Sequence, residues 1–353
     1  MSLNAPIKVM LVEDSFTIRE VLKRIIDKED GIEVISEAEN PIIADRLIHQ
    51  YSPDILILDI NMPEMDGLTF LQILMRKKPM PVIVFSSITN KGSSNIDKAF
   101  QLGAAEVFSK PNQVHSFGST RHQLIHSIRG IIRLNSKKNS PCRRFQSPKI
   151  KDSVAKEDYV FIGASTGGTR AIREILMSFP DFIPPVCISL HIPAKFSKPF
   201  AEQLNEICPF TVKEAENGDL LKENQVLIAP GDHHMEVDYD PESLCPYHVK
   251  LSNEDRGQSH RPSINLLFSS AAKWMGAKSI GIILTGMGND GAKGLLNMRK
   301  TGAMTLSQNK STSSIYGMPK EAMRIGASQK ACSLYEIASE IFKKCPLPDS
   351  FVR

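Results

Sequence analysis

Short runs of Val, Ile and Leu alternate along this chain with segments whose apolar residues recur at helical spacing. In a first region the apolar runs occupy residues 7–13, 55–60 and 81–86, with another strand expected around Val34–Ile35. In a second region they occupy residues 159–165, 186–192, 224–230 and 279–286. Apolar runs without polar alternation are typical of strands that helices cover on both faces. The pattern therefore predicts two α/β regions, each doubly wound around a mostly parallel sheet.

A different pattern separates the two regions. Residues 119–134 place Leu and Ile side chains at helical spacing, which predicts an amphipathic helix. Residues 135–156 are rich in Ser, Lys and Pro and poor in apolar side chains, as flexible linkers are. A chain of 353 residues also exceeds the size at which a single core stops growing, about 250–300 residues. We therefore predict domains at residues 1–134 and 157–353, joined by a basic linker at 135–156.

The formal net charge of +4 is concentrated in one part of the chain. Residues 1–120 hold 12 basic and 16 acidic side chains, and residues 152–353 hold 22 basic and 23 acidic ones. Residues 121–151 hold 9 basic side chains and no acidic one. A nucleic-acid-binding domain carries its positive charge on a folded recognition surface. Because the charge here lies in a terminal helix and a linker, we expect no nucleic-acid partner.

Other compositional features exclude several classes of protein. No apolar stretch approaches the roughly 18–20 residues that a membrane-spanning helix needs. The N-terminal sequence MSLNAPIKVMLVEDS reaches acidic residues after only a few apolar ones, so we expect no signal peptide. The six cysteines never form a Cys-x-x-Cys pair, which argues against a zinc site and a disulfide scaffold. We expect a cytoplasmic protein with reduced thiols.

In the first region, polar side chains follow successive strands. They are Glu13 and Asp14 after the first apolar run, Asp59 in the second, Ser86 in the third and Lys110 after a fourth strand at EVFS. An Asp after a strand, taken alone, is more often a helix cap or turn former. Carboxylates gathered at one sheet edge need a cation, and hard oxygen ligands suit Mg²⁺. A hydroxyl and a lysine beside them suit a phosphoryl group, which a carboxylate can accept as a nucleophile.

In the second region, the sequence Gly163-Ala164-Ser165-Thr166-Gly167 lies between a predicted strand and a predicted helix. The spacing G-x-S-x-G fits a nucleophile elbow, in which a serine sits on a sharp turn between small residues. A glycine-rich turn before a helix can also bind phosphate. A dinucleotide site requires G-x-G-x-x-G, and Ser165 occupies the second glycine position of that motif.

A serine nucleophile needs a base and an acid that orients the base. His191 ends the next predicted strand, and Asp290 lies in the glycine-rich loop after the strand at 279–286. A lone His is more often structural, and an Asp before Gly is an ordinary turn former. The order Ser165, His191, Asp290 differs from the order in α/β-hydrolases, chymotrypsin and subtilisin. We therefore predict a triad on another fold. We expect the adjacent His233 and His234 to be structural, because neighbours on a strand face opposite ways.

Residues 6–134 resemble the receiver domain of two-component response regulators, a flavodoxin-like fold. The resemblance implies that Asp59 accepts a phosphoryl group from a histidine kinase, with Ser86 and Lys110 binding that group. Mg²⁺ is then held by Glu13, Asp14, Asp59 and the carbonyl of Asn61. Family members often have two aspartates at the Glu13-Asp14 position. Val107 stands where the family has an aromatic switch residue, and Phe108 beside it should face the other side of the strand.

Residues 157–347 resemble the catalytic domain of the CheB family, the protein-glutamate methylesterases of chemotaxis. The matching segments are GASTGG at 163–168, HIP at 191–193, APGDHHMEV at 229–237, RPSIN at 261–265, LTGMGNDGAKGL at 284–295 and YGMPKEA at 316–322. The order receiver, basic linker and catalytic domain is that family's layout. The resemblance implies hydrolysis of glutamyl methyl esters on chemotaxis receptors, with deamidation of receptor glutamines as a second activity.

For the site, the resemblance implies Ser165 as nucleophile, His191 as base and Asp290 as orienting acid. The amide of Met287 is then an oxyanion donor, and Thr166 lines the site. We expect no cofactor for the ester chemistry, a monomeric protein, and a receiver that covers the site until it is phosphorylated. Two alternatives remain. A DNA-binding response regulator would need a small basic output domain, which this sequence does not show, and a catalytically inactive scaffold is the other.

Overall fold

A computed structural model describes residues 5–86, 98–100, 102–110, 117–135, 158–255, 257 and 260–345. The chain divides into two compact units, Met1–Lys138 and Asn139–Arg353. Most of the predicted linker, residues 136–156, lies outside the described residues, so its flexibility stays a prediction. The predicted helix at 119–134 is present as α5, Phe117–Asn135. None of the helices in the described ranges is long and apolar enough to cross a membrane.

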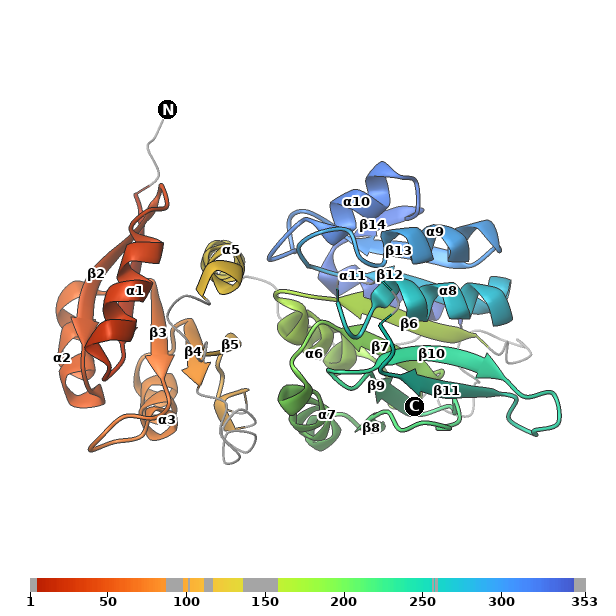
Figure 1. Ribbon diagram of the computed structural model, residues 1–353, viewed down its shortest axis with the longest axis horizontal. Helices are drawn as coiled ribbons and strands as arrows, with labels where there is room; N and C mark the ends of the chain where they lie inside the picture. Colours follow the sequence, from red (N-terminus) through yellow and green to blue (C-terminus); the bar gives the residue numbers. More distant parts are fainter. Residues whose placement is uncertain are drawn as a thin grey trace. The chain divides into compact units, whose positions relative to one another are not determined.

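The first unit is a five-stranded parallel sheet with the strand order β2-β1-β3-β4-β5 (Figure 1). Its strands are β1 Ile7–Val12, β2 Ile32–Ala38, β3 Ile55–Asp59, β4 Val82–Ser86 and β5 Glu106–Ser109. Its helices are α1 Phe16–Ile26, α2 Pro41–Tyr51, α3 Gly67–Lys77 and α5. Side-chain caps start the first three helices, where Ser15, Asn40 and Asp66 each accept a hydrogen bond from an amide of the first turn.

Alternation along the strands builds a core on each face of this sheet. Met10 and Val12 pack with α2 and α3, whereas Val9 and Leu11 pack with α1 and α5. The same alternation separates the two residues at the switch position of β5. Val107 is half-buried on the α2–α3 face, and Phe108 is buried on the α1–α5 face. The ring of Phe108 stacks on Phe85 with a centroid distance of 5.5 Å. The prediction that Phe108 faces away from Val107 is therefore confirmed.

The second unit is a seven-stranded parallel sheet with the order β14-β13-β12-β6-β7-β9-β8, accompanied by an antiparallel hairpin. The strands of the sheet are β6 Tyr159–Ala164, β7 Val186–Leu190, β8 Thr211–Glu214, β9 Gln225–Ile228, β12 Ser279–Ile283, β13 Met304–Gln308 and β14 Lys330–Cys332. The hairpin strands are β10 His234–Tyr239 and β11 Tyr247–Ser252. The helices are α6 Gly168–Ser178, α7 Ala194–Ile207, α8 Ile264–Trp274, α9 Ala292–Lys300, α10 Met318–Arg324 and α11 Leu334–Lys344, with a 3₁₀ turn η2 at Gly276–Lys278.

Helices cover both faces of the second sheet, as the apolar runs predict (Figure 1). On one face, residues of α8, α9 and α10 form a buried core with Phe161, Ile283 and the hairpin. Helix α8 packs very close to β6, because a Cβ at Gly163 would lie 2.2 Å from Cγ2 of Ile264. The four predicted strands of this region are present. Sequence patterns missed β8, β13, β14 and the hairpin, which are short or partly exposed and lack a continuous apolar run.

The strand order of this sheet reverses direction at the central strand β6. The chain enters at the central strand β6, adds β7, β9 and β8 on one side, and then adds β12, β13 and β14 on the other. At such a reversal, the loops that follow two adjacent strands lead to opposite sides of the sheet. Open α/β sheets bind ligands between those loops. Ser165 follows β6, His191 follows β7, and the loop of Asp290 follows β12.

Candidate functional site

The turn that carries Ser165 is held by backbone contacts. The Ser165 amide donates to the carbonyl of Thr285 (3.0 Å), and the Gly168 amide donates to the carbonyl of Ser165 (2.6 Å). Gly167 has a left-handed φ of 76°, and a Cβ there would lie 2.5 Å from Oγ of Ser314. Only glycine meets both conditions without strain. The sharp turn leaves Ser165 buried, at 9% exposure, with its hydroxyl beside the His191 ring.

The structure brings Ser165, His191 and Asp290 into one hydrogen-bonded line. Nδ1 of His191 lies 3.1 Å from Oγ of Ser165, and Nε2 lies 2.8 Å from Oδ2 of Asp290. The carboxylate can only accept at Nε2, so it favours the tautomer with a proton on that nitrogen. Nδ1 then presents a lone pair to the serine hydroxyl. The His191 amide donates to the carbonyl of Ala164 (3.1 Å), which ties the histidine loop to the serine turn.

Asp290 lies against the N-terminus of α8. Its carboxylate accepts further hydrogen bonds from the amides of Ile264 (2.9 Å), Asn265 (3.0 Å) and Gly291 (2.9 Å) and from the hydroxyl of Ser263 (3.2 Å). Burial alone raises the pKa of Asp290, but His191 and these amides outweigh it and hold the pKa below its usual value. The carboxylate is therefore fully charged and rigidly oriented. Sequence analysis missed this support, although Ser263 before an apolar helix is a recognisable N-cap signal.

His234 supports the same helix start. It is buried, and its Nδ1 accepts a hydrogen bond from the amide of Ser263 (3.1 Å). A structural role is thus seen for His234, whose contact holds Ser263 at the N-cap position of α8.

A second histidine lies at the site and was missed from the sequence. The His260 ring stacks on the His191 ring, with centroids 4.1 Å apart and planes 7° apart. His260 is exposed overall, yet burial of its ring and the nearby charge of His191 lower its pKa, against an opposing effect of Asp290. Two stacked rings direct their nitrogen lone pairs along parallel planes. One potential ligand atom each of His191, His260 and Asp290 lie within 4.8 Å of one another, but two stacked rings do not direct their lone pairs to one point, as a tetrahedral site requires.

The two residues expected around a developing oxyanion also lie beside the serine. Thr166 is buried at 8% exposure, and its carbonyl accepts a hydrogen bond from Oγ1 of Thr285 (3.0 Å). Met287 follows Gly286 in the loop after β12, and its side chain is 44% exposed at the surface. Among the described residues, neither the Thr166 amide nor the Met287 amide donates a hydrogen bond to the protein. Their role as oxyanion donors stays a prediction.

The first unit has its own polar cluster at the carboxyl edge of the sheet. Nζ of Lys110 lies 2.8 Å from Oε2 of Glu13 and 2.7 Å from Oδ2 of Asp59. Glu13 and Asp59 are almost fully buried, whereas Asp14 is exposed. Oxygen atoms of these three carboxyl groups lie within 4.8 Å of one another. The Asn61 amide donates to Oδ1 of Asp59 (3.1 Å).

The two buried acids of this cluster, Glu13 and Asp59, have raised pKa values. Burial, followed by the charge of Asp59, raises the pKa of Glu13 to about 7 despite Lys110. Burial also raises the pKa of Asp59, with Lys110 acting in the opposite direction. One lysine therefore does not balance the buried negative charge. The carboxylate oxygens of this cluster keep an excess of negative charge beside Lys110. Such an oxygen donor set fits a small hard cation such as Mg²⁺.

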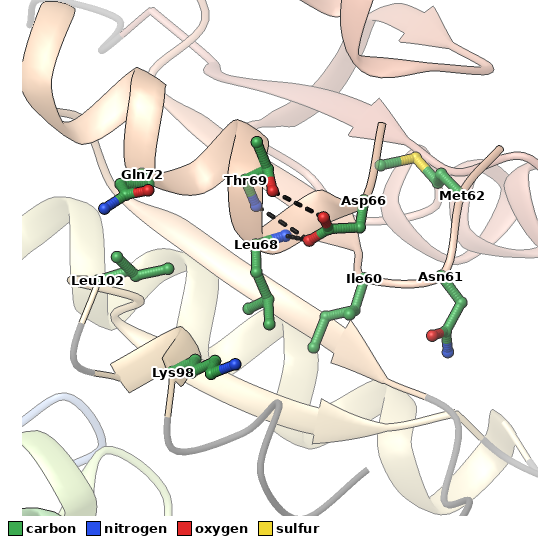
Figure 2. Close-up of a pocket in the computed structure, with 9 residues that line it drawn as sticks. All are labelled: Ile60, Asn61, Met62, Asp66, Leu68, Thr69, Gln72, Lys98 and Leu102. Atoms are coloured by element: carbon green, nitrogen blue, oxygen red, sulfur yellow. Dashed lines mark hydrogen bonds between the residues drawn. The ribbon is translucent and has the colours of Figure 1, made fainter. Parts of the chain in front are cut away.

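One residue expected to bind the phosphoryl group, Ser86, is described only in part. Ser86 ends β4 in register with Ser109 of β5, but its side chain lies outside the described residues. Beside the cluster, a pocket of about 850 Å³ is lined by the β3–α3 loop, by α3 and by Lys98 and Leu102 (Figure 2). Asn61 belongs to both, through its bond to Asp59 and its place at the pocket rim. Asp66, which caps α3, also lines the pocket.

The two units together define a class of protein. A flavodoxin-like unit with an acidic cluster precedes a doubly wound unit with serine, histidine and aspartate at its switch point. This is a response regulator with an enzymatic output domain. The response regulator receiver domain family matches residues 9–118, and the CheB methylesterase family matches residues 160–341. The chain belongs to the CheB methylesterase family.

Similar proteins extend over nearly the whole chain. A protein-glutamate methylesterase/protein-glutamine glutaminase of Salmonella typhi is 39% identical over 96% of this chain and 97% of its own length. The Escherichia coli K12 protein of that name is 38% identical with the same coverage. Protein 2 of that name in Rhodospirillum rubrum is 37% identical over 96% of this chain and 98% of its own length. The CheB methylesterase catalytic domain of Thermotoga maritima is similar in structure, with a TM-score of 0.50, 32% identity and coverage of 53% of this chain and 98% of that one.

Proposed function

We propose that this protein is a phosphorylation-regulated esterase that hydrolyses glutamyl methyl esters on chemotaxis receptors and deamidates receptor glutamines. The observation that carries the proposal is the hydrogen-bonded line from Ser165 through His191 to Asp290. The activity in the names of the similar proteins of Salmonella typhi and Escherichia coli supports the substrate class. The acidic cluster around Asp59 supports control by phosphorylation.

The ester chemistry follows from the geometry of the line. Nδ1 of His191 takes the proton of the Ser165 hydroxyl as Oγ attacks the ester carbonyl. The imidazolium that forms is stabilised by Asp290, and the amides of Thr166 and Met287 stabilise the oxyanion. His191 then gives its proton to the departing methoxide, which leaves as methanol. Attack of water on the acyl-serine, with His191 again as base, yields the glutamate carboxylate and restores Ser165. The same sequence on a glutamine amide releases ammonia.

The receiver chemistry centres on Asp59. We infer that its carboxylate attacks a phosphohistidine of a chemotaxis histidine kinase and becomes an acyl phosphate. Glu13, Asp14, Asp59 and the carbonyl of Asn61 would hold Mg²⁺, which neutralises charge on the phosphoryl oxygens. Lys110, which contacts Asp59, would pair with the phosphoryl group, and Ser86 at the end of the neighbouring strand β4 would bind it. We expect phosphorylation of Asp59 to raise the esterase activity by shifting the population toward an active state.

Methanol release from membranes with methylated receptors tests chemistry and control together. The full chain should release methanol, and acetyl phosphate with Mg²⁺ should raise the rate. Ser165→Ala should abolish release under both conditions, whereas Asp59→Asn should leave the basal rate and remove the stimulation. Full activity of Ser165→Ala would overturn the esterase proposal. Equal stimulation of Asp59→Asn and the parent would overturn the assignment of the phosphorylation site.

A further inference from the structure

His260 belongs to the turn that places Asp290. Three residues after it, Ser263 begins the contacts of the α8 N-terminus with the Asp290 carboxylate. At the other end of this turn, the His260 ring lies flat over the His191 ring. The segment 260–265 therefore contacts both Asp290 and His191. Its amides bind the Asp290 carboxylate, and the His260 ring packs on the face of the His191 imidazole. The His191 side chain is only 8% exposed beneath this cover.

We propose that His260 is a positioning residue, which keeps the His191 ring in the plane that joins Ser165 to Asp290 and must itself be uncharged for Ser165 to be activated. This inference rests on the proposed esterase function. His260 acts through His191 and is not assigned a contact with substrate.

The positioning role of His260 follows from the ability of the His191 imidazole to rotate about its side-chain bonds. His191 must keep Nδ1 at Ser165 and Nε2 at Asp290 simultaneously, and a rotation of the ring breaks both bonds. The ends of the ring are fixed by those partners, but its faces need packing to resist rotation. A flat neighbour at 4.1 Å supplies that packing on one face. Small errors in the position of a general base cost large factors in rate.

The charge requirement follows from the reaction. As Ser165 attacks, His191 becomes an imidazolium, and a second positive charge stacked on it would oppose this step. Among the described residues, the charged groups that act on the His260 ring are His191 and Asp290. The adjacent Arg261 directs its guanidinium away, to the carbonyl of Asn253. The lowered pKa of His260 agrees with a ring that stays uncharged near neutral pH.

Three substitutions separate these two roles. His260→Phe keeps a flat neutral ring, His260→Arg supplies a planar cation, and His260→Ala removes the cover. His248→Ala, on the β10–β11 hairpin, is the matched control. The readouts in the full chain are the second-order rate of Ser165 labelling by a fluorophosphonate and the kcat and KM of methanol release. Thermal midpoints establish that each variant is folded.

At pH 8 we expect His260→Ala to slow labelling and lower kcat about tenfold with little change in KM. His260→Phe should restore most of that loss, and His260→Arg should slow both reactions about 30-fold or more despite its flat shape. The ratio of the Phe variant's rate to the parent's should rise as pH falls from 8 to 5.5, because only the parent gains the opposing charge.

Two results would overturn the inference. Labelling of His260→Ala at the parent rate would remove the positioning role, and equal rates for the Phe and Arg variants with a pH-independent ratio would remove the charge requirement. The proposed function fails differently. In that case Ser165 reacts with the fluorophosphonate at a His260-dependent rate, but no methanol is released from methylated receptors.

Discussion

The two acidic sites of this protein occupy equivalent places but have opposite electrostatics. Each lies at the carboxyl edge of a parallel sheet beside the point where strand order reverses. In the second unit, the pKa of Asp290 is lowered by His191 and by amides at the α8 N-terminus. In the first unit, burial raises the pKa of both Glu13 and Asp59, although Lys110 contacts them.

The difference matches what each site needs from outside the chain. The charge of Asp290 is balanced within the protein, so the Ser165 line is assembled before any ligand arrives. Lys110 does not balance the charges of Glu13 and Asp59, so we expect this cluster to bind a cation and to respond to a phosphoryl group. A self-contained site suits a catalyst, and an incomplete site suits a sensor. Four changes test this comparison.

The largest effect is expected from Asp290→Asn. The amide can donate to His191 and so favours the wrong tautomer, and it cannot stabilise the imidazolium. We expect a loss of about 10³–10⁴-fold in kcat for methanol release. Fluorophosphonate labelling of Ser165 should slow in parallel. A loss below tenfold would show that catalysis does not need the Asp290 carboxylate. It would contradict the claim that this internally balanced charge completes the catalytic site.

Mg²⁺ binding to the receiver should depend on pH. Glu13, with a pKa of about 7, is protonated below that value and ionised above it. Mg²⁺ must displace this proton, so the affinity should fall about tenfold for each pH unit below 7 and level off above it. Calorimetric titration of the full chain with Mg²⁺ from pH 5.5 to 8.5 measures this dependence. Glu13→Gln is the matched control. It should weaken Mg²⁺ binding and remove the part of the pH dependence that comes from protonation of Glu13.

The stability of the first unit should rise when Asp59 loses its charge. A raised folded-state pKa means that stability is fully present below the unfolded pKa, about 3.9, and is lost as pH increases. Asp59→Asn should therefore raise the thermal midpoint of this unit by a few degrees at pH 8 without Mg²⁺, an effect of about 1 kcal/mol. Near pH 3 the two proteins should unfold together.

The corresponding change in the second unit should act in the opposite direction. The lowered pKa of Asp290 contributes stability that is present above the unfolded pKa and is lost as pH falls through the folded value. Asp290→Asn should thus lower the midpoint of its unit at pH 8. Shifts of the same sign for Asp59→Asn and Asp290→Asn, observed by calorimetry, would contradict the comparison.

The smallest effect is expected from Ser263→Ala. This change removes one donor at 3.2 Å from the Asp290 carboxylate and leaves three amides and His191 in place. We expect kcat to fall about threefold, because one hydrogen bond among several contributes about 1 kcal/mol or less. Methanol release at pH 8 measures it. A much larger loss would mean that the hydroxyl, and not the helix amides, orients the carboxylate.

The local pattern along the chain was enough to predict much of the fold and both clusters. Continuous apolar runs marked the central strands, and polar residues after them marked the sites at Asp59 and Ser165. This worked because a parallel sheet gathers the carboxyl ends of its strands at one edge, whatever the helices between them. Short or half-exposed strands such as β8 and β14 carry too few apolar residues to give a comparable signal.

By itself, the sequence determined which residues bear the chemistry: a serine on a glycine turn, a histidine and an aspartate after later strands, and an acidic cluster after earlier ones. Only the tertiary structure decided how they are used. Strand order placed β6 between β7 and β12, so that Nδ1 of His191 faces Ser165 and Nε2 faces Asp290. Packing of α8 on β6 aimed its first amides at Asp290 and laid His260 on His191. These contacts join segments distant in sequence, and their energies depend on burial and direction, which exist only once the chain is folded.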